Sequence, residues 1–191
     1  MLVDVPVLRG ERVLLRPVAP EDRAARQRLG FDADIERGYG VVRESGAMSD
    51  DEADDWYSTM VAAARDPLRM AWVVEVEGAP AGTASLQAIR RVDAKARFAV
   101  GMFTPGLTGR GLGGEATRLV LAHAFGPMAL HRVDLRVLDF NHRAIAMYRR
   151  CGFVVEGRER GSCRMGDAWV DDVMMGVLVD EFRGGSELDH H

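Results

Sequence analysis

A glycine-rich segment at residues 109–114, Gly-Arg-Gly-Leu-Gly-Gly, constrains this chain more than any other feature. Glycine lets backbone amides approach a ligand closely, and the apolar periodicity that follows predicts a helix at residues 115–125. The free N–H groups and the positive end of that helix would point into the segment, an arrangement suited to phosphate or pyrophosphate. The sequence therefore predicts an anion-binding loop. The alternative is a flexible turn between a strand and a helix.

Sequence patterns on both sides of this loop predict a mixed fold. Helices are expected at residues 20–29, 49–65 and 141–151, with irregular, glycine-punctuated chain at 31–46. Gly78-Ala79-Pro80 predicts a turn between two strands. The expected strands lie at residues 13–16, 70–77, 81–91, 97–103, 131–138, 153–161 and 168–179. Because strands and helices mix without regular βαβ alternation, the predicted class is α+β with a mostly antiparallel sheet.

Length and charge exclude several classes of protein. The 191 residues suit one domain, expected at residues 1–183, while residues 184–191 are typical of an expression-tag remnant or a disordered tail. A net charge of −4 argues against a nucleic-acid partner. No apolar run approaches the roughly 20 residues that cross a bilayer, and no secretory signal is evident. We therefore expect a soluble, cytoplasmic protein without a membrane partner. Cys151, Cys163 and the histidines lack metal-ligand spacing, so no metal is expected.

Two other phosphate-binding motifs compete for the glycine loop. A Walker A loop ends in Gly-Lys-Ser/Thr, whereas Glu115 follows the last glycine here, so nucleotide hydrolysis is excluded. The dinucleotide fingerprint G-x-G-x-x-G matches literally at Gly109, Gly111 and Gly114, and Asp139 could imitate the ribose-binding acid. That fingerprint requires a strand running almost directly into the first glycine within βαβ units. Residues 104–108 intervene here, which leaves an NAD-dependent enzyme as a minor alternative.

A second motif occupies residues 141–153, Asn-His-Arg-Ala-Ile-Ala-Met-Tyr-Arg-Arg-Cys-Gly-Phe. Seven helical residues at about 100° each return to within about 20° of the starting direction. Asn141 and Tyr148 are therefore predicted on one helical face, with Ala144 and Ile145 between them. The alternative interpretation makes Tyr148 a core aromatic and Asn141 a helix N-cap.

Together these two motifs resemble those of the GNAT superfamily, the acyl-CoA-dependent N-acyltransferases. Residues 108–113 are similar to the family's pyrophosphate loop Q/R-x-x-G-x-G/A, with Thr108 at the usual Gln/Arg position. Residues 141–153 are similar to N-x-x-A/S-x-x-x-Y-x-x-x-G-F. Segments 78–82, 98–105 and 169–175 extend the resemblance over residues 13–182, and the last resembles the branch of ribosomal-protein N-terminal acetyltransferases. The implied fold is a GNAT-like mixed, mostly antiparallel central sheet flanked by helices.

The resemblance implies acetyl-CoA as the acyl donor and direct attack of an amine on the thioester in a ternary complex. Tyr148 would be the general acid that protonates the departing CoA thiolate. Backbone amides near Met102 and Phe103 would hold the pantetheine arm and the developing oxyanion. The residues implied in binding the pyrophosphate are Thr108, Gly109, Arg110, Gly111, Leu112, Gly113 and Gly114, and those lining the pantetheine channel are Asn141, Ala144 and Tyr148.

The strand at residues 97–103 contains no carboxylate, although many members of this family carry a catalytic glutamate there. At pH 7.4 a lysine amine with a pKa of about 10.4 is roughly 0.1% neutral, whereas an α-amine near 7.8 is roughly a quarter neutral. We therefore expect the acceptor to be a protein N-terminal α-amine or a small amino compound. Other possible bases are Glu36, Glu44, Asp139 and His142.

The acceptor site is expected at residues 31–46 and at the closing strand pair. There Asp32, Asp34 and Glu36 could attract a cationic amine, and Trp56 and Tyr57 are candidate pocket residues. Two further functions stay open: transfer of succinyl or another acyl group, and a non-catalytic CoA-binding sensor domain. A homodimer is also compatible with the family.

Overall fold

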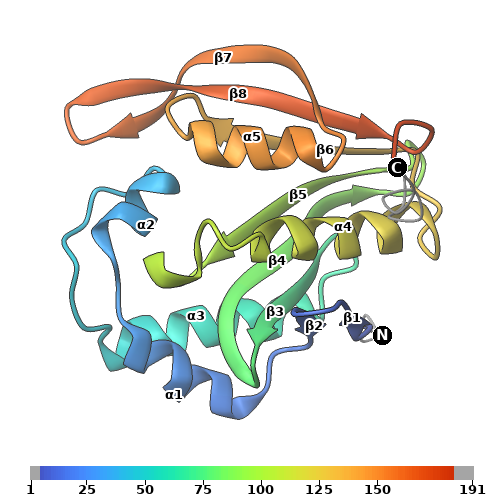
Figure 1. Cartoon of the computed structure of the whole chain (residues 1–191). Coiled ribbons are helices and arrows are strands. Elements are labelled where there is room, and N and C mark those ends of the chain that lie inside the picture. Colours follow the sequence, from blue (N-terminus) through green and yellow to red (C-terminus); the bar gives the residue numbers. More distant parts are fainter. Residues whose placement is uncertain (1–4, 183–191) are drawn as a thin grey trace.

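The computed structural model describes residues 5–182, which form one eight-stranded sheet with helices on both faces (Figure 1). The predicted tail at residues 184–191 lies outside the described residues. The strand order is β1-β2-β3-β4-β5-β6-β8-β7, and every neighbouring pair is antiparallel except β5 and β6. The predicted α+β class with a mostly antiparallel sheet is therefore confirmed. The strands are β1 (Leu8–Arg9), β2 (Leu14–Arg16), β3 (Met70–Val76), β4 (Ala79–Arg90), β5 (Lys95–Met102), β6 (Arg132–Leu138), β7 (Val154–Met165) and β8 (Ala168–Leu178).

The helices lie on opposite faces of the sheet because successive strand residues point to opposite sides. In β3, Trp72 and Val74 join the main core under the helices α4 and α5. Their neighbours Ala71 and Val73 pack instead with Met60 of α3. The helices are α1 (Pro20–Leu29), α2 (Ala33–Gly38), α3 (Asp50–Ala63), α4 (Leu112–Phe125) and α5 (His142–Arg150), with a 3₁₀ turn at Pro105–Leu107.

Strands β5 and β6 are hydrogen-bonded at one end only. Their parallel pairing covers Lys95 with Arg132, Ala96 with Val133, and Arg97 with Asp134. β6 instead continues alongside β8 as far as Leu138. Within residues 5–182, the edge of β5 beyond Arg97 consequently has no strand partner on the β6 side, and this opening positions the site described below.

Three local predictions are corrected by the structure. A helix, α2, forms in the segment expected to be irregular, because the Asp32 side chain accepts hydrogen bonds from the amides of Asp34 and Ile35 and caps its first turn. Pro80 lies in β4, and the turn before it consists of Glu77 and Gly78, both with positive φ as a two-residue hairpin turn requires.

The third correction concerns the glycine loop, since α4 begins at Leu112 and not at residue 115. Gly113 and Gly114 therefore belong to the first turn of the helix. Within the part of the chain that the structure describes, no helix is long and apolar enough to cross a membrane.

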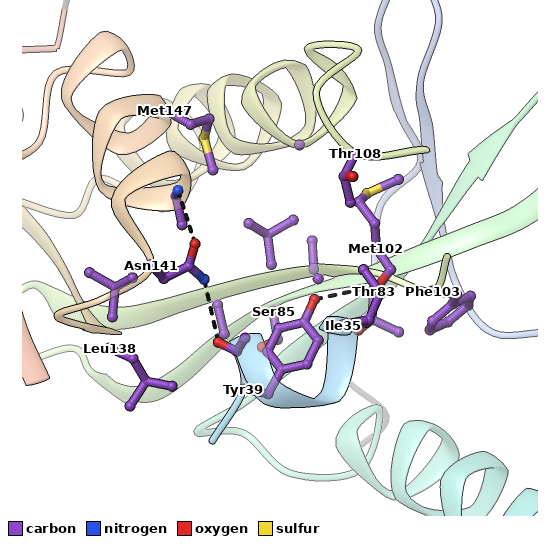
Figure 2. A pocket seen from close by; sticks show the side chains of 18 of the residues that line it. Ile35, Tyr39, Thr83, Ser85, Met102, Phe103, Thr108, Leu138, Asn141 and Met147 are labelled. Atoms are coloured by element: carbon purple, nitrogen blue, oxygen red, sulfur yellow. Dashed lines mark hydrogen bonds between the residues drawn. The ribbon is translucent and has the colours of Figure 1, made fainter. Parts of the chain in front are cut away.

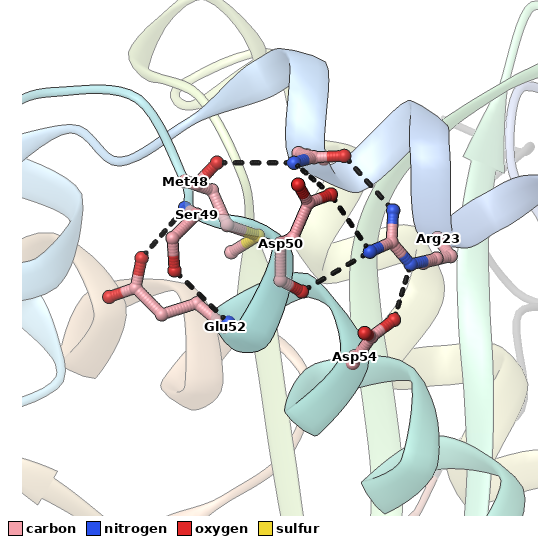
Figure 3. A network of polar contacts seen from close by, with 7 residues as sticks. Arg23, Met48, Ser49, Asp50, Glu52 and Asp54 are labelled. Carbon is pink, nitrogen blue, oxygen red and sulfur yellow. Dashed lines mark hydrogen bonds and ion pairs between the residues drawn. The ribbon is translucent and has the colours of Figure 1, made fainter.

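Helix α3 begins with the capping box predicted from the sequence (Figure 3). The Ser49 hydroxyl accepts from the amide of Glu52 at 3.2 Å, and the Glu52 carboxylate accepts from the amide of Ser49 at 2.9 Å. This carboxylate–amide bond is the main cause of a lowered pKa of Glu52. Two acidic residues of α3, Asp50 and Asp54, form ion pairs with Arg23 of α1 and so link the two helices.

We predict that Ser49→Ala lowers the free energy of unfolding by about 1 kcal/mol, because it removes the side-chain acceptor of the capping box. For a domain of this size the thermal midpoint should fall by about 2–4 °C, measured by calorimetry. Ser58→Ala is the matched control, since Ser58 is exposed on the same helix. Equal midpoints for the two variants would show that the cap contributes nothing measurable.

Candidate active site

A cavity of about 990 Å³ opens between the separated ends of β5 and β6 (Figure 2). Helices α1, α2 and α3 supply one wall, whereas the start of α4 and one face of α5 supply the other. The cavity brings together every predicted cofactor-binding residue except Arg110. Those that line it are Met102, Phe103, Thr108, Gly109, Gly111, Leu112, Gly113, Gly114, Asn141, Ala144 and Tyr148.

The start of α4 presents free backbone amides to this cavity. Gly111 is the N-cap, with the positive φ of 82° that glycine adopts without strain, and no side chain caps the helix. The first intrahelical bond runs from the amide of Glu115 to the carbonyl of Gly111. The amides of Leu112, Gly113 and Gly114 precede that bond, so they remain available to an anionic ligand at the positive end of the helix.

Three arginine side chains lie near the glycine loop, and they differ in whether they already bind other groups of the protein. Arg12 pairs with Glu115 and donates to the carbonyl of Arg110 at 2.9 Å. The side chain of Arg110 lies outside the cavity lining, on the side of Glu77. Arg143 of α5 lines the cavity, with its Nη1 4.0 Å from where a Cβ on Gly109 would lie. Arg143 is thus a cation beside the loop that the sequence interpretation did not select.

Thr108 does not replace the basic side chain that the family pattern has at its position. Its hydroxyl donates to the carbonyl of Pro105 at 2.6 Å and closes the 3₁₀ turn. The positive charge at this end of the cavity therefore comes from α5, through Arg143, and from the helix start itself.

The backbone edge of β5 offers hydrogen-bonding groups at Met102 but not at Phe103. The amide of Phe103 donates to the carbonyl of Ala81 at 2.9 Å. Because the hydrogen-bonding direction alternates along an antiparallel strand, the groups of Met102 face the opposite edge, where β6 has separated. The expectation of two free amides is therefore corrected to one, and Phe103 contributes its ring to the cavity wall.

Tyr39, which the sequence interpretation also missed, reaches into the cavity from the end of α2 (Figure 2). The residue is half exposed, while its hydroxyl turns inward to lie 3.5 Å from the carbonyl of Met102. Burial of the hydroxyl raises the pKa of Tyr39 to about 12, so the phenol stays protonated. A Cβ on Gly101 would collide with that hydroxyl, so the glycine allows Tyr39 to lie in this position. A glycine inside a strand is the one sequence signal for this close approach.

Tyr148 belongs to both the core and the cavity wall. The residue is 6% exposed, and its ring packs edge-to-face against Phe98 and Phe153, with centroids 6.4 and 5.7 Å apart. Burial, followed by the nearby Tyr39, raises the pKa of Tyr148. The phenol is therefore a protonated donor at neutral pH, in a ring that packing holds in place.

Asn141 is the N-cap of α5, as the alternative interpretation expected. Its Oδ1 accepts from the amide of Ala144 at 3.2 Å, and its Nδ2 donates to the carbonyl of Gly38 at 3.4 Å (Figure 2). The side chain also lines the cavity. It therefore fixes the start of α5 and joins it to α2 across the cavity.

The other candidate acids and aromatics divide into two groups. Asp34, Glu36 and Trp56 line the cavity, whereas Asp32 is occupied in capping α2. Residues that do not line it are Glu44, Tyr57, Asp139 and His142, and Asp139 is paired with Arg158. Asp172 of β8 also lines the cavity, a carboxylate that sequence patterns did not single out. Among residues 5–182 no group of three or more His, Cys, Asp or Glu side chains could hold a metal ion.

These features fit a ligand that has a pyrophosphate and an extended arm with amide groups. The free amides of α4 suit the pyrophosphate, the open edge of β5 suits the arm, and two protonated phenols stand where the arm would end. Coenzyme A has this chemistry.

Comparisons with known proteins agree with this class of site. The family model described as acetyltransferase (GNAT) domain matches residues 12–154, and the chain therefore belongs to this family. Spermidine N(1)-acetyltransferase of Escherichia coli K12 is 32% identical over 145 residues, covering 76% of this chain and 74% of that protein. The chain is an acyl-CoA-dependent N-acyltransferase that uses acetyl-CoA.

Solved structures show the same fold. An acetyltransferase structure from T. thermophilus is 27% identical with a TM-score of 0.76, over 95% of this chain and 93% of that one. Mycobacterium smegmatis RimJ in complex with CoA-disulfide has a TM-score of 0.78 at 22% identity, over 93% and 89%. Because the similar proteins include both a spermidine acetyltransferase and RimJ, the predicted ribosomal-protein branch is not assigned.

We predict that Arg143→Gln raises the dissociation constant of CoA about fivefold to tenfold, because it removes the cation beside Gly109. Isothermal titration calorimetry at low and high salt measures this loss, and salt should reduce the difference by screening. Arg110→Gln is the control, since that side chain lies outside the cavity lining; less than about a twofold change is expected. Equal losses in both variants would contradict a specific role for Arg143.

Proposed function

We propose that this protein transfers the acetyl group of acetyl-CoA to a small primary amine by direct attack within a ternary complex. One observation carries this proposal: the uncapped start of α4, the open edge of β5 at Met102 and the phenol of Tyr148 all face one cavity. Bound acetyl-CoA supplies a thioester whose acetyl carbon accepts the amine. The remaining chemistry is positioning and proton transfer by residues of the chain.

Each part of the cavity then has a task. The amides of Leu112, Gly113 and Gly114, with Arg143, bind the pyrophosphate. The backbone of Met102 binds the pantetheine arm. Its carbonyl, which lies 3.5 Å from the hydroxyl of Tyr39, then accepts a hydrogen bond from the ligand instead. Tyr148 donates its proton to the departing thiolate, and its raised pKa keeps that proton available across the neutral range.

The carboxylates at the cavity favour a cationic amine, and their placement bears on its basicity. No carboxylate lies on β5, whereas Asp34, Glu36 and Asp172 line the cavity from α2 and β8. These can attract an ammonium group without holding a base on the strand that carries the thioester. We infer that the acceptor is an α-amine or another weakly basic amine, of a small compound or of a peptide N-terminus. The spermidine acetyltransferase relative supports a small amine in general.

We predict that Tyr148→Phe lowers kcat by up to about 100-fold and leaves the KM for acetyl-CoA within about threefold, because it removes the acid but keeps the packed ring. The release of free CoA thiol measures this change. Tyr57→Phe is the control, since Tyr57 lies outside the cavity lining. An unchanged kcat in Tyr148→Phe would assign the proton to another group, Tyr39 being the nearest phenol.

We also predict that at pH 7.4 the kcat/KM for a peptide α-amine exceeds that for a lysine ε-amine about 250-fold, following the neutral fraction of each amine. One acceptor is a short peptide with a free α-amine, and the other is a lysine peptide whose α-amine is blocked. They are compared between about pH 7 and 10, a range that spans the α-amine pKa and approaches that of the ε-amine. The difference should shrink as the pH rises, because the ε-amine gains its neutral form. Equal rates at pH 7.4 would reveal a strong base in the cavity.

The same amine panel separates two alternatives. A rate that is higher with succinyl-CoA than with acetyl-CoA would keep the fold and change the acyl group. Binding of CoA without thiol release for any amine would identify a sensor domain. The retained phenol of Tyr148 in the cavity favours the enzyme.

A further inference from the structure

Arg26 of α1 is a buried cation that nothing in the transfer of an acetyl group requires. Its side chain lines the cavity, and the residue is 6% exposed. Nη1 donates to the carbonyl of Gly30, while the buried Nε has no hydrogen-bond partner within residues 5–182. The guanidinium lies over the ring of Phe103 at 4.7 Å from its centroid and beside Phe31 at 5.2 Å.

A buried guanidinium normally has a carboxylate partner, because an uncompensated charge away from water is costly. Arg16, near the same helix, shows the usual solution, since it pairs with both Asp22 and Glu75. Arg26 makes no ion pair among the described residues, and its burial lowers its pKa. The two phenylalanine rings attract the cation but do not neutralise it.

Of the charged side chains near Arg26, two form an ion pair with each other and one carboxylate has no ion-pair partner among the described residues. Glu36, Arg43 and Glu52 are the charged side chains that act on Arg26 most strongly. Arg43 and Glu52 pair with each other at 2.8 Å. Glu36 lines the cavity and has no ion pair within residues 5–182. The cavity wall therefore offers a positive and a negative site to one ligand.

Arg26 lies beside the end of β5, where an acceptor must meet the thioester, and Glu36 lines the same cavity from α2. Phe103, on which Arg26 stacks, directly follows Met102, and the hydroxyl of Tyr39 lies at the carbonyl of Met102. Trp56 of α3 packs edge-to-face against Phe103 and closes this wall, with centroids 5.9 Å apart. A ligand group held by Arg26 is thus placed next to the reacting end of the cavity.

We propose that the acceptor is a primary amine that carries a carboxylate near the amine, and that Arg26 binds this carboxylate while Glu36 attracts the ammonium group. The inference rests on the proposed acetyl transfer to a small amine and narrows its substrate class to zwitterions such as small peptides or amino acids. Arg26 acts here as a specificity-determining residue. A polyamine, which has no anion, would leave Arg26 uncompensated.

The test compares alanyl-alanine with its C-terminal amide, two acceptors with α-amines of similar basicity that differ in the carboxylate, and adds spermidine as a third. Thiol release gives kcat/KM for each acceptor with wild type, Arg26→Gln and Arg26→Lys. Arg28→Gln is the matched control, because Arg28 is exposed on the same helix. The dissociation constant of CoA and the thermal midpoint report whether each variant is folded.

We expect wild type to prefer the dipeptide over its amide about tenfold to hundredfold, the range of one charge-assisted contact. Arg26→Gln should abolish that preference by slowing the dipeptide alone, Arg26→Lys should restore part of it, and Arg28→Gln should resemble wild type. The inference is overturned if wild type prefers the amide or spermidine, or if Arg26→Gln slows dipeptide and amide equally, which would mark a structural residue. Absence of thiol release with all three amines, while CoA still binds, would instead contradict the proposed function.

Discussion

The separation of β5 from β6 after a short parallel pairing is the constraint on which the rest of the site depends. Pairing ends at Arg97 and Asp134, so among residues 5–182 the backbone of Met102 has no strand partner on the β6 side, and its carbonyl meets only the hydroxyl of Tyr39. Unpaired backbone groups inside a protein must be satisfied by a ligand or by water. The start of α4 and helix α2 both line the cavity that this separation opens (Figure 1). The opening in the sheet thus creates the cavity and leaves a strand edge to which a ligand can hydrogen-bond.

Two parts of the cavity wall carry different charged groups. At the α4 end, free amides and Arg143 face the place of a phosphate, and Glu115 is kept away by its bonds to Arg12 and Val13. On the wall formed by α1 and α2, Arg26 and Glu36 have no ion-pair partners among the described residues. A donor bound at the α4 end and a small zwitterion at this wall would satisfy both sets of groups.

The sequence predicted the elements that depend on local signals. The capping box at Ser49 and the helix ended by Gly152 each have a chemistry that a few neighbouring residues determine. The glycine loop before α4 was also recognised, although α4 begins at Leu112 rather than at residue 115. Family resemblance added the acetyl-CoA site, and the matched family model confirms that membership. α2 was missed because a single side chain, Asp32, stabilises its first turn, which is a weak signal among glycines.

The residues that sequence reasoning missed depend on distant contacts. Tyr39 faces Met102, which is 63 positions away, and Asp172 reaches the cavity through the pairing of β8 with β6. Arg26 appears in the sequence as one of several arginines on a polar helix, and only its burial against Phe103 distinguishes it. The loss of the Phe103 amide likewise follows from the register of β4 and β5, which no local pattern specifies.

The central claim is that the α4 start and the β5 edge form an acetyl-CoA site, and thermal unfolding with added ligands tests it most directly. At 100 times its dissociation constant a ligand adds about 2.7 kcal/mol of stability, and each kcal/mol moves the midpoint of such a domain by about 2–4 °C. The account predicts a rise of roughly 5–10 °C with acetyl-CoA or CoA and none with NAD. A rise with NAD and none with any CoA species would contradict it.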